Sequence, residues 1–333
     1  MYIIETYSWA VACAVITMIC WGSWPNARKL GRSTWRFELF YWDYVMGVLL
    51  VSSVMALTWG AHGTQGRNIW DDLQLANTSA LLSAAAGGVI FNAGNILFMA
   101  AIAFAGLAVA FPVGAGLAMV LGILVNYIAV PAGSPYFLFG GMVCIVLAIL
   151  LSAAAYRRQA QQLNKPPLKG ILLAISAGIL FGFFYRFIAA SMATDFSNPQ
   201  PGLLTPYTAV LFFAIGTVVS NLLFNTLLMY RPLEGKPVRY SDYFSGSLRD
   251  HFSGWLGGAI WGLGISLSIL CAGKVGYAVS FGLGQCNAMI AAIWGVFVWK
   301  EFKNAPAGTN RLLYGMFACY MMGILLIIGA REN

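Results

Sequence analysis

The sequence predicts an all-α, polytopic membrane protein with ten transmembrane helices arranged as two inverted five-helix repeats. Three observations lead to this fold class. The composition is 60% hydrophobic and 9% charged with mean hydropathy +0.76, which excludes an ordinary soluble domain. One segment of the chain occurs twice, and the basic residues concentrate in alternate loops.

Ten apolar stretches are long enough to cross a membrane, because a helix needs about 20 apolar residues to span ~30 Å of hydrocarbon. The 11 Trp and 15 Tyr residues fit aromatic belts at the two interfaces. We place the helices at residues 4–24, 39–60, 79–103, 107–129, 135–155, 169–193, 205–228, 253–273, 276–299 and 309–329.

The repeated segment is Gly87–Ile123, which aligns without a gap to Gly257–Ile293 after a shift of 170 positions. Each copy is predicted to form two apolar helices joined by a very short turn, at Gly106 or Gly276. Small residues at every third or fourth position allow helix backbones to approach closely in lipid.

The repeat divides the chain into residues 1–156, a basic cytoplasmic connector at 157–168, and residues 169–333. Five helices precede the connector and five follow it. An odd number of helices makes the second half enter the membrane from the opposite side, so the repeats are predicted to be inverted. Transporters with this arrangement keep their substrate near the midplane, where the repeats meet.

The charge distribution predicts the orientation. Loops after the first, fifth, seventh and ninth helices hold 15 of the 19 Lys and Arg residues. By the positive-inside rule these loops are cytoplasmic and both termini are extracytoplasmic, in the cell membrane. The net charge of +8 is therefore explained without a nucleic-acid partner.

The first helix ends in Trp21, Trp24 and Pro25. Pro25 should break or kink the helix, and the carbonyls that it frees are tolerable only beside a polar or wet space. Trp21 and Trp24 are therefore candidate substrate-binding residues beside a cavity. The alternative is that both belong to an interfacial belt.

Asp43 lies about one turn inside the second helix. Ionisable residues within the membrane are costly and usually face the bundle interior, so Asp43 is a candidate proton-coupling residue. The alternative is a structural ion pair with the basic cluster between Arg28 and Arg36.

Amide side chains in apolar helices need partners, either from another helix or from a bound solute. Asn92 and Asn95 in the third helix, and Gln285 and Asn287 in the second copy of the repeat, are candidate substrate-binding residues. For each Asn, hydrogen bonding between helices is the alternative.

Arg186 is the strongly basic residue placed within a span, toward the predicted outer surface. We expect a pair between Glu5 and Arg186 to act as an outer gate; the alternative is that Arg186 extends to the interface without a partner. Residues 229–252 are expected to form a solvated and interfacial loop. His62 and His251 are expected to be solvated loop residues, and Lys300 with Glu301 a solvated pair.

Several motifs together resemble the drug/metabolite transporter superfamily, and within it the branch of ureide permeases and rhamnose-proton symporters. They are Glu5 with Gly22–Pro25, Asp43–Tyr44, Gly94–Asn95, Asn126–Tyr127, Gly276–Ala278, Gln285, Trp294–Val296, Lys300–Phe302 and Asn304–Ala305. The resemblance implies a ten-helix carrier that imports a small polar solute with protons. Two features depart from plant ureide permeases: the short connector lacks a phosphate-loop-like motif, and Ile265 stands where they have Asn.

The leading hypothesis is secondary active transport of a small neutral solute, ureide-like or nucleobase-like, by alternating access with proton coupling. A sugar or nucleoside symporter is the alternative. A membrane-embedded enzyme is disfavoured because no HExxH, GxSxG or GxxxxGK[ST] motif occurs, and the scarcity of charged rings disfavours an ion channel. No cofactor or metal is expected, and the protein is expected to be a monomer or homodimer.

Overall fold

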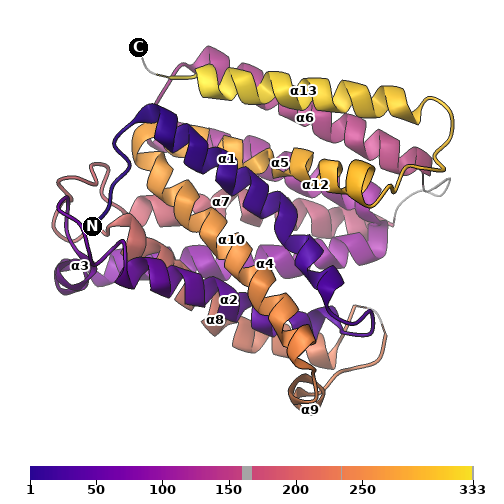
Figure 1. The fold of residues 1–333 in the computed structure, drawn as a ribbon, viewed down its shortest axis with the longest axis horizontal. Coiled ribbons are helices and arrows are strands. Elements are labelled where there is room, and N and C mark those ends of the chain that lie inside the picture. Colours follow the sequence, from indigo (N-terminus) through magenta and orange to yellow (C-terminus); the bar gives the residue numbers. More distant parts are fainter. Residues whose placement is uncertain (160–166, 234, 332–333) are drawn as a thin grey trace. The chain divides into compact units, whose positions relative to one another are not determined.

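A computed structural model describes residues 1–159, 167–233 and 235–331, with the backbone alone at 107 and 108 (Figure 1). Within these residues the structure is helical apart from two isolated bridges, Ala76 to Gly202 and Met192 to Leu204. Ten helices are long and apolar enough to cross a membrane. The predicted fold class is therefore confirmed as an all-α protein with ten candidate spans.

The ten predicted spans all appear as helices. Their bounds are α1 Tyr7–Ser23, α2 Phe37–Leu57, α4 Thr78–Ala105, α5 Leu107–Ala129, α6 Pro135–Gln159, α7 Leu168–Ser191, α8 Pro206–Tyr230, α10 Leu248–Val275, α11 Tyr277–Gln285 continued by α12 Asn287–Ile293 and the π-helical η2 Trp294–Val298, and α13 Thr309–Gly329. The short elements are the 3₁₀ helix η1 Trp24–Leu30, α3 Ile69–Leu75 and α9 Tyr240–Phe244. As predicted, Pro25 marks the end of regular α-helix in α1.

Both predicted short turns are present. A single residue separates α4 from α5 and α10 from α11: Gly106 with φ 77° and ψ 161°, and Gly276 with φ 85° and ψ 152°. Positive φ is accessible to glycine at little cost because it has no Cβ. The two copies of the repeated sequence therefore turn with nearly the same backbone geometry.

The chain forms two compact units. Unit 1 comprises residues 1–92 and 184–274, and unit 2 comprises residues 93–183 and 275–333. Each unit contains helices from both predicted halves. The two compact units are therefore not the same as the two halves defined by the sequence repeat. The boundaries predicted from the repeat stay a prediction, and most of the predicted connector, 157–168, lies outside the described residues.

In unit 1, the second helix of each predicted half, α2 and α8, run antiparallel. Asn225 near the end of α8 donates to the Glu38 carbonyl at the start of α2, at 2.8 Å, and Gly60 after the end of α2 lies against Tyr207 at the start of α8. Inversion of the repeat requires corresponding helices to run in opposite directions. The antiparallel pairing of α2 and α8 agrees with that requirement. The inverted orientation of the two complete halves stays a prediction.

Glycines set the closest helix contacts of unit 1, and they do so in corresponding places. A methyl group at Gly88 of α4 would overlap the Phe213 carbonyl of α8. At the repeat-equivalent Gly258 of α10, it would overlap the Tyr44 carbonyl of α2. The pairs α4 with α8 and α10 with α2 therefore pack backbone against backbone through the same glycine of the repeat.

In unit 2, α6 and α13 are the fifth helices of the two predicted halves, and they lie side by side (Figure 1). They run antiparallel, because the Ser134 amide donates to the Ala330 carbonyl at 3.0 Å, joining the start of α6 to the end of α13. Gly141 of α6 and Gly323 of α13 lie in contact. A Cβ at Gly141 would lie 2.8 Å from the Gly323 carbonyl oxygen, and a Cβ at Gly323 would lie 3.0 Å from the Gly141 carbonyl oxygen.

We expect Gly141→Ala to destabilise the protein by about 1–3 kcal/mol, because its methyl group would press on the Gly323 carbonyl and on Ile327. The neighbouring Gly140 is a matched control, since a Cβ there would have its nearest neighbour, Leu326, at 3.8 Å. Gly140→Ala should leave stability within about 0.5 kcal/mol. Thermal unfolding in detergent measures both, and equal effects would contradict the close contact.

Candidate functional site

The site is built around four consecutive residues of α2, Tyr41 to Tyr44. Successive helical positions are rotated by about 100°, so these side chains face different neighbours. Their partners are Asn92 of α4 for Tyr41, Met229 of α8 for Trp42, Tyr243 of α9 and His251 of α10 for Asp43, and Trp24 of η1 for Tyr44. This short run therefore joins α2 to five other elements of unit 1.

Asp43 is fully buried, and both of its oxygens receive hydrogen bonds. Tyr243 Oη donates to Oδ1 at 2.7 Å, and His251 Nδ1 donates to Oδ2 at 2.8 Å. A carboxylate removed from water needs such donors to be tolerated. The His251 side chain is 23% exposed, against 0% for Asp43. Solvent protons can therefore reach the pair through the imidazole.

Aromatic rings hold the His251 imidazole in place. The Tyr243 ring meets it edge to face with centroids 4.8 Å apart, and the Trp35 ring does so at 5.4 Å. Burial, and next the hydrogen bond to Asp43, raise the pKa of the Tyr243 hydroxyl well above its usual range. Tyr243 therefore remains a proton donor toward Asp43 throughout the physiological pH range.

The nearby basic residues have other partners. Arg32 donates through Nε to Asp250 Oδ2 at 2.6 Å, and Arg36 donates through Nη2 to Glu38 Oε1 at 2.6 Å. In the described part of the chain Asp43 forms no ion pair with this cluster. The structural alternative for Asp43, a pair with the cluster between Arg28 and Arg36, is therefore wrong.

His251 was missed by the sequence reasoning, which expected a solvated loop residue. It lies in the first turn of α10, which begins at Leu248, five residues before the predicted start of that helix. The sequence did hold a signal, because His251, Gly254 and Gly258 share one helical face. That face packs on α2: a Cβ at Gly254 would meet Asp43, and one at Gly258 would meet Tyr44.

The loop between α8 and α10 is also more ordered than expected. It contains α9, whose Tyr243 reaches Asp43 and whose Tyr240 ring lies 5.9 Å from the Trp42 ring. Most described residues of the loop are exposed, which agrees with the expected solvated connector, but Tyr243 and Tyr240 also tie it to α2. The loop covers the end of α2 that carries Asp43.

Beside this cluster, four stacked rings form what we call the aromatic wall: Trp21, Trp261, Phe91 and Phe213. Trp261 stacks on Trp21 with centroids 5.7 Å apart and planes at 10°, on Phe91 at 4.3 Å, and on Phe213 at 5.8 Å. Phe91 and Trp261 occupy equivalent positions of the repeat. The sequence reasoning singled out Trp21 and missed Trp261, although the gapless repeat alignment pairs it with another aromatic residue.

The two predicted tryptophans differ in their surroundings. Trp21 is 6% exposed, and its indole nitrogen has no hydrogen-bond acceptor among the described residues. Trp24 is half-buried and packs on Tyr44 at 4.7 Å. Burial of Trp21 against Trp261 disfavours the belt alternative for this residue. Their role in substrate binding stays a prediction.

Asn92 is buried and joins three helices. It accepts a hydrogen bond from Tyr41 Oη at 2.9 Å and donates to Ser220 Oγ at 2.9 Å and to the Thr217 carbonyl at 3.3 Å. These bonds connect α4 with α2 and α8. They favour the alternative of hydrogen bonding between helices, and a direct contact with substrate stays a prediction.

The other predicted amides lie in unit 2. Asn95 is half-buried in α4. Gln285 ends α11 and Asn287 begins α12, so both flank a break in the ninth span at Cys286. Within the described residues of unit 2, neither of these two side chains has a hydrogen-bond partner. Interrupted helices in membrane proteins commonly line cavities. The role of Gln285 and Asn287 in substrate binding therefore stays a prediction.

The predicted outer gate is not formed in this structure. Glu5 accepts a hydrogen bond from Gln65, and no ion pair joins it to Arg186 within the described part of unit 1. Arg186 is half-buried on α7. A pair between Glu5 and Arg186 would require another conformation and stays a prediction.

The expected pair of Lys300 and Glu301 is also absent from the described residues, so that interpretation is wrong. Glu301 Oε2 instead accepts from Tyr156 Oη at 3.2 Å within unit 2. Lys300 adopts a positive φ of 54°, directly after the π-helical η2. The backbone geometry at the end of this span turns Glu301 toward α6 rather than toward its sequence neighbour.

Known proteins resemble this chain over nearly its whole length. The family model described as ureide permease matches residues 40–165 and 156–330. Ureide permease 1 of Arabidopsis thaliana is 24% identical over an alignment of 390 positions, gaps included, which covers 99% of each chain. Ureide permease 3 of the same plant is 26% identical over 84% of this chain and 89% of its own. A crystal structure of another protein, at 14% identity, covers 96% of this chain and 97% of its own with a TM-score of 0.58, which supports the fold alone.

The hydrogen bond between His251 and Asp43 predicts non-additive stability effects. His251→Phe should cost about 1–3 kcal/mol, because it removes a hydrogen-bond donor to a buried carboxylate. The double variant Asp43→Asn with His251→Phe should be destabilised by less than the sum of the single variants. Thermal unfolding in detergent measures all three, and strictly additive losses would contradict the pairing.

Proposed function

Because this chain belongs to the ureide permease family, we propose that it is a secondary active transporter of a small neutral polar solute, coupled to protons. The solute would be of the ureide or nucleobase type, as the names of the relatives suggest. The observation that carries the coupling mechanism is the buried Asp43, which is hydrogen-bonded to a partly exposed histidine at one end of α2.

The substrate class follows from the side chains near the aromatic wall and from the predicted amides. Ureides and nucleobases are flat or compact, uncharged and rich in N–H and C=O groups. Such a solute can stack on indole rings, as Trp21 and Trp261 already stack on each other within unit 1. Within unit 2, Gln285 and Asn287 remain candidate hydrogen-bond partners for its N–H and C=O groups.

Proton coupling is assigned to Asp43 and His251 together. When the pair holds no extra proton, the carboxylate keeps its hydrogen bonds to Tyr243 and His251. When a proton is added to the carboxylate, its charge is lost and both bonds weaken, because hydrogen bonds to a charged acceptor are the stronger ones. The contacts of α9 and α10 with α2 are then weaker. Proton binding is thereby coupled to the helix movement that alternating access requires.

The predicted gate of Glu5 and Arg186 would close the other side of the transporter in a different conformation. The same proposal places the protein in the cell membrane, with the loop that carries α9 in the cytoplasm and both termini outside. Protons released from the Asp43 pair would then enter the cytoplasm by way of the partly exposed His251.

The alternative proposal is a symporter for a sugar or nucleoside. Two departures from plant ureide permeases keep it open, namely Ile265 and the short connector. A thermal-shift screen with ureides, nucleobases, nucleosides and simple sugars on the purified protein separates the solute classes, because a bound solute stabilises the folded state.

Asp43→Asn should abolish solute-driven proton uptake in proteoliposomes while solute binding and solute counterflow remain. The amide keeps the size of the carboxylate and its oxygen can still accept from Tyr243, but it cannot carry the proton. Asp71→Asn is the matched control, because Asp71 is an exposed carboxylate on α3. Proton uptake that persists in the Asp43 variant would remove the coupling role, and absence of counterflow in the wild-type protein would argue against a carrier.

A further inference from the structure

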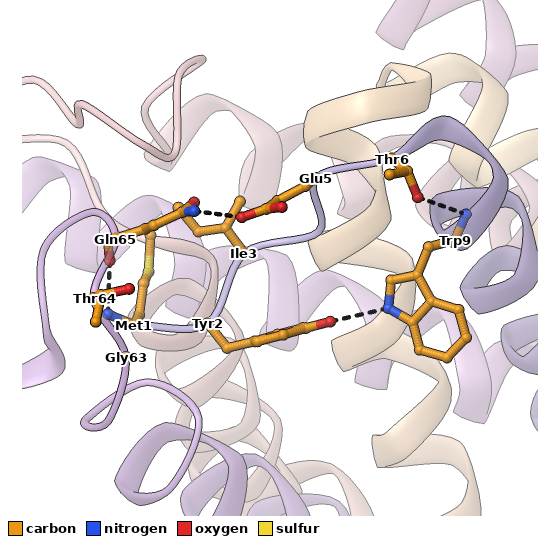
Figure 2. A pocket seen from close by; sticks show the side chains of 9 residues that line it. All are labelled: Met1, Tyr2, Ile3, Glu5, Thr6, Trp9, Gly63, Thr64 and Gln65. Atoms are coloured by element: carbon orange, nitrogen blue, oxygen red, sulfur yellow. Dashed lines mark hydrogen bonds between the residues drawn. The ribbon is translucent and has the colours of Figure 1, made fainter.

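A pocket lies in unit 1, lined by none of the residues of the Asp43 cluster or the aromatic wall. Its volume is ≈ 340 Å³, and its lining comes from the N-terminal segment and from the turn before α3 (Figure 2): Met1, Tyr2, Ile3, Glu5, Thr6, Trp9, Gly63, Thr64 and Gln65. We call it the N-terminal pocket. Its volume lies within the range of small-molecule sites.

Hydrogen bonds fix the walls of this pocket. The Met1 ammonium donates to the Gln65 carbonyl at 2.7 Å. The Tyr2 backbone is held at both ends, because its amide donates to the Trp59 carbonyl at 2.8 Å and its carbonyl accepts from Tyr207 Oη at 2.9 Å. A pocket whose walls are already fixed loses little conformational entropy when a ligand binds.

Two hydrogen-bonded pairs face each other across the pocket. Figure 2 shows Glu5 with Gln65 along one edge and Tyr2 with Trp9 along the opposite edge. The Tyr2 and Trp9 side chains are 41% and 46% exposed, so their rings are available to a ligand. The pocket therefore offers hydrogen-bond acceptors on one wall and aromatic surface on the other.

The acceptor wall suits a ligand that donates through N–H groups. An ionised carboxylate can accept about four hydrogen bonds, and Gln65 donates one to Glu5 Oε1. A urea group presents two parallel N–H donors, one on each nitrogen, which match the two oxygens of a carboxylate, and an amide presents N–H donors that can bond one of these oxygens. The Met1 ammonium donates to the Gln65 carbonyl, and the donor to Glu5 is the Gln65 side chain, so further acceptor positions of the carboxylate can receive N–H groups of a ligand.

We propose that the N-terminal pocket is a second binding site, for a solute bearing urea or amide N–H groups, held by Glu5 and covered by Tyr2 and Trp9. This inference deepens the proposed function, because it makes the pocket the place where the solute is captured before transport. By the charge distribution of the loops, the pocket faces the extracytoplasmic side, from which an imported solute arrives.

Allantoin, a ureide, is the probe, and the fluorescence of Trp9 is the signal. Allantoin is titrated into the purified protein, which is tagged only at its C-terminus. It should change the tryptophan fluorescence of the wild type, and Trp9→Phe should remove most of this change. The difference between the wild-type and variant titrations reports binding of allantoin in the pocket. No difference between them would overturn the proposal, whatever the transport assay shows.

Glu5→Gln tests the chemistry of the pocket. The amide has nearly the same shape but lacks the charge, so the Trp9 signal should require about 10-fold more allantoin or more, as expected for loss of hydrogen bonds to a charged group. L-rhamnose, which has no N–H group, should give no signal. An unchanged titration in the Glu5 variant, or an equal response to rhamnose, would contradict the proposed recognition.

Comparison with transport separates the two proposals. Asp43→Asn should leave the Trp9 titration unchanged, because Asp43 lies outside the pocket, and Asp71→Asn serves as the control for an exposed carboxylate. A Trp9 response without any uptake of allantoin would support the pocket and reject the proposed function for this solute. Uptake without a Trp9 response would support the function and reject the pocket.

Discussion

Close contact between helix backbones at glycine is the constraint from which the rest of the structure follows. Lipid supplies no hydrophobic driving force between helices, so contact depends on packing and on polar bonds that short distances permit. In unit 1, Gly254 and Gly258 bring α10 against α2 so closely that a methyl group at Gly254 would overlap Asp43. The same approach brings His251, one turn earlier, within 2.8 Å of the Asp43 carboxylate.

The repeated sequence supplies the same packing twice but the ionisable pair once. Gly258 meets Tyr44 and its repeat equivalent Gly88 meets Phe213, so Asp43 corresponds to Phe212, and the shift of 170 positions pairs His251 with Leu81. The glycine contacts are alike, at Gly88 and at Gly258. A duplicated scaffold can therefore keep its symmetric helix packing while one copy carries the hydrogen-bonded pair of Asp43 and His251, because backbone contacts at glycine do not depend on the side chains one turn away.

Unit 1 contains three chemically distinct features. Asp43 is a buried carboxylate whose two oxygens receive hydrogen bonds. The aromatic wall gives flat apolar surface beside it, and the N-terminal pocket gives acceptors and rings at the surface. Hydrogen bonds from Tyr41 to Asn92 and from Asn92 to α8 connect α2, α4 and α8. A displacement of α2 would therefore also displace α4 and α8, which carry two rings of the aromatic wall.

The sequence by itself determined the fold class, the ten spans and the two glycine turns. Hydropathy over about 20 residues and positive φ at glycine are local properties that need no knowledge of neighbouring helices. It also pointed to Asp43, because a carboxylate in an apolar span is costly wherever it lies. Only the tertiary structure decided its partners: His251 and Tyr243 lie about 200 residues away in the chain. The polar loop composition suggested exposure to solvent, and only the packing of α9 and α10 on α2 shows that both side chains face the buried carboxylate.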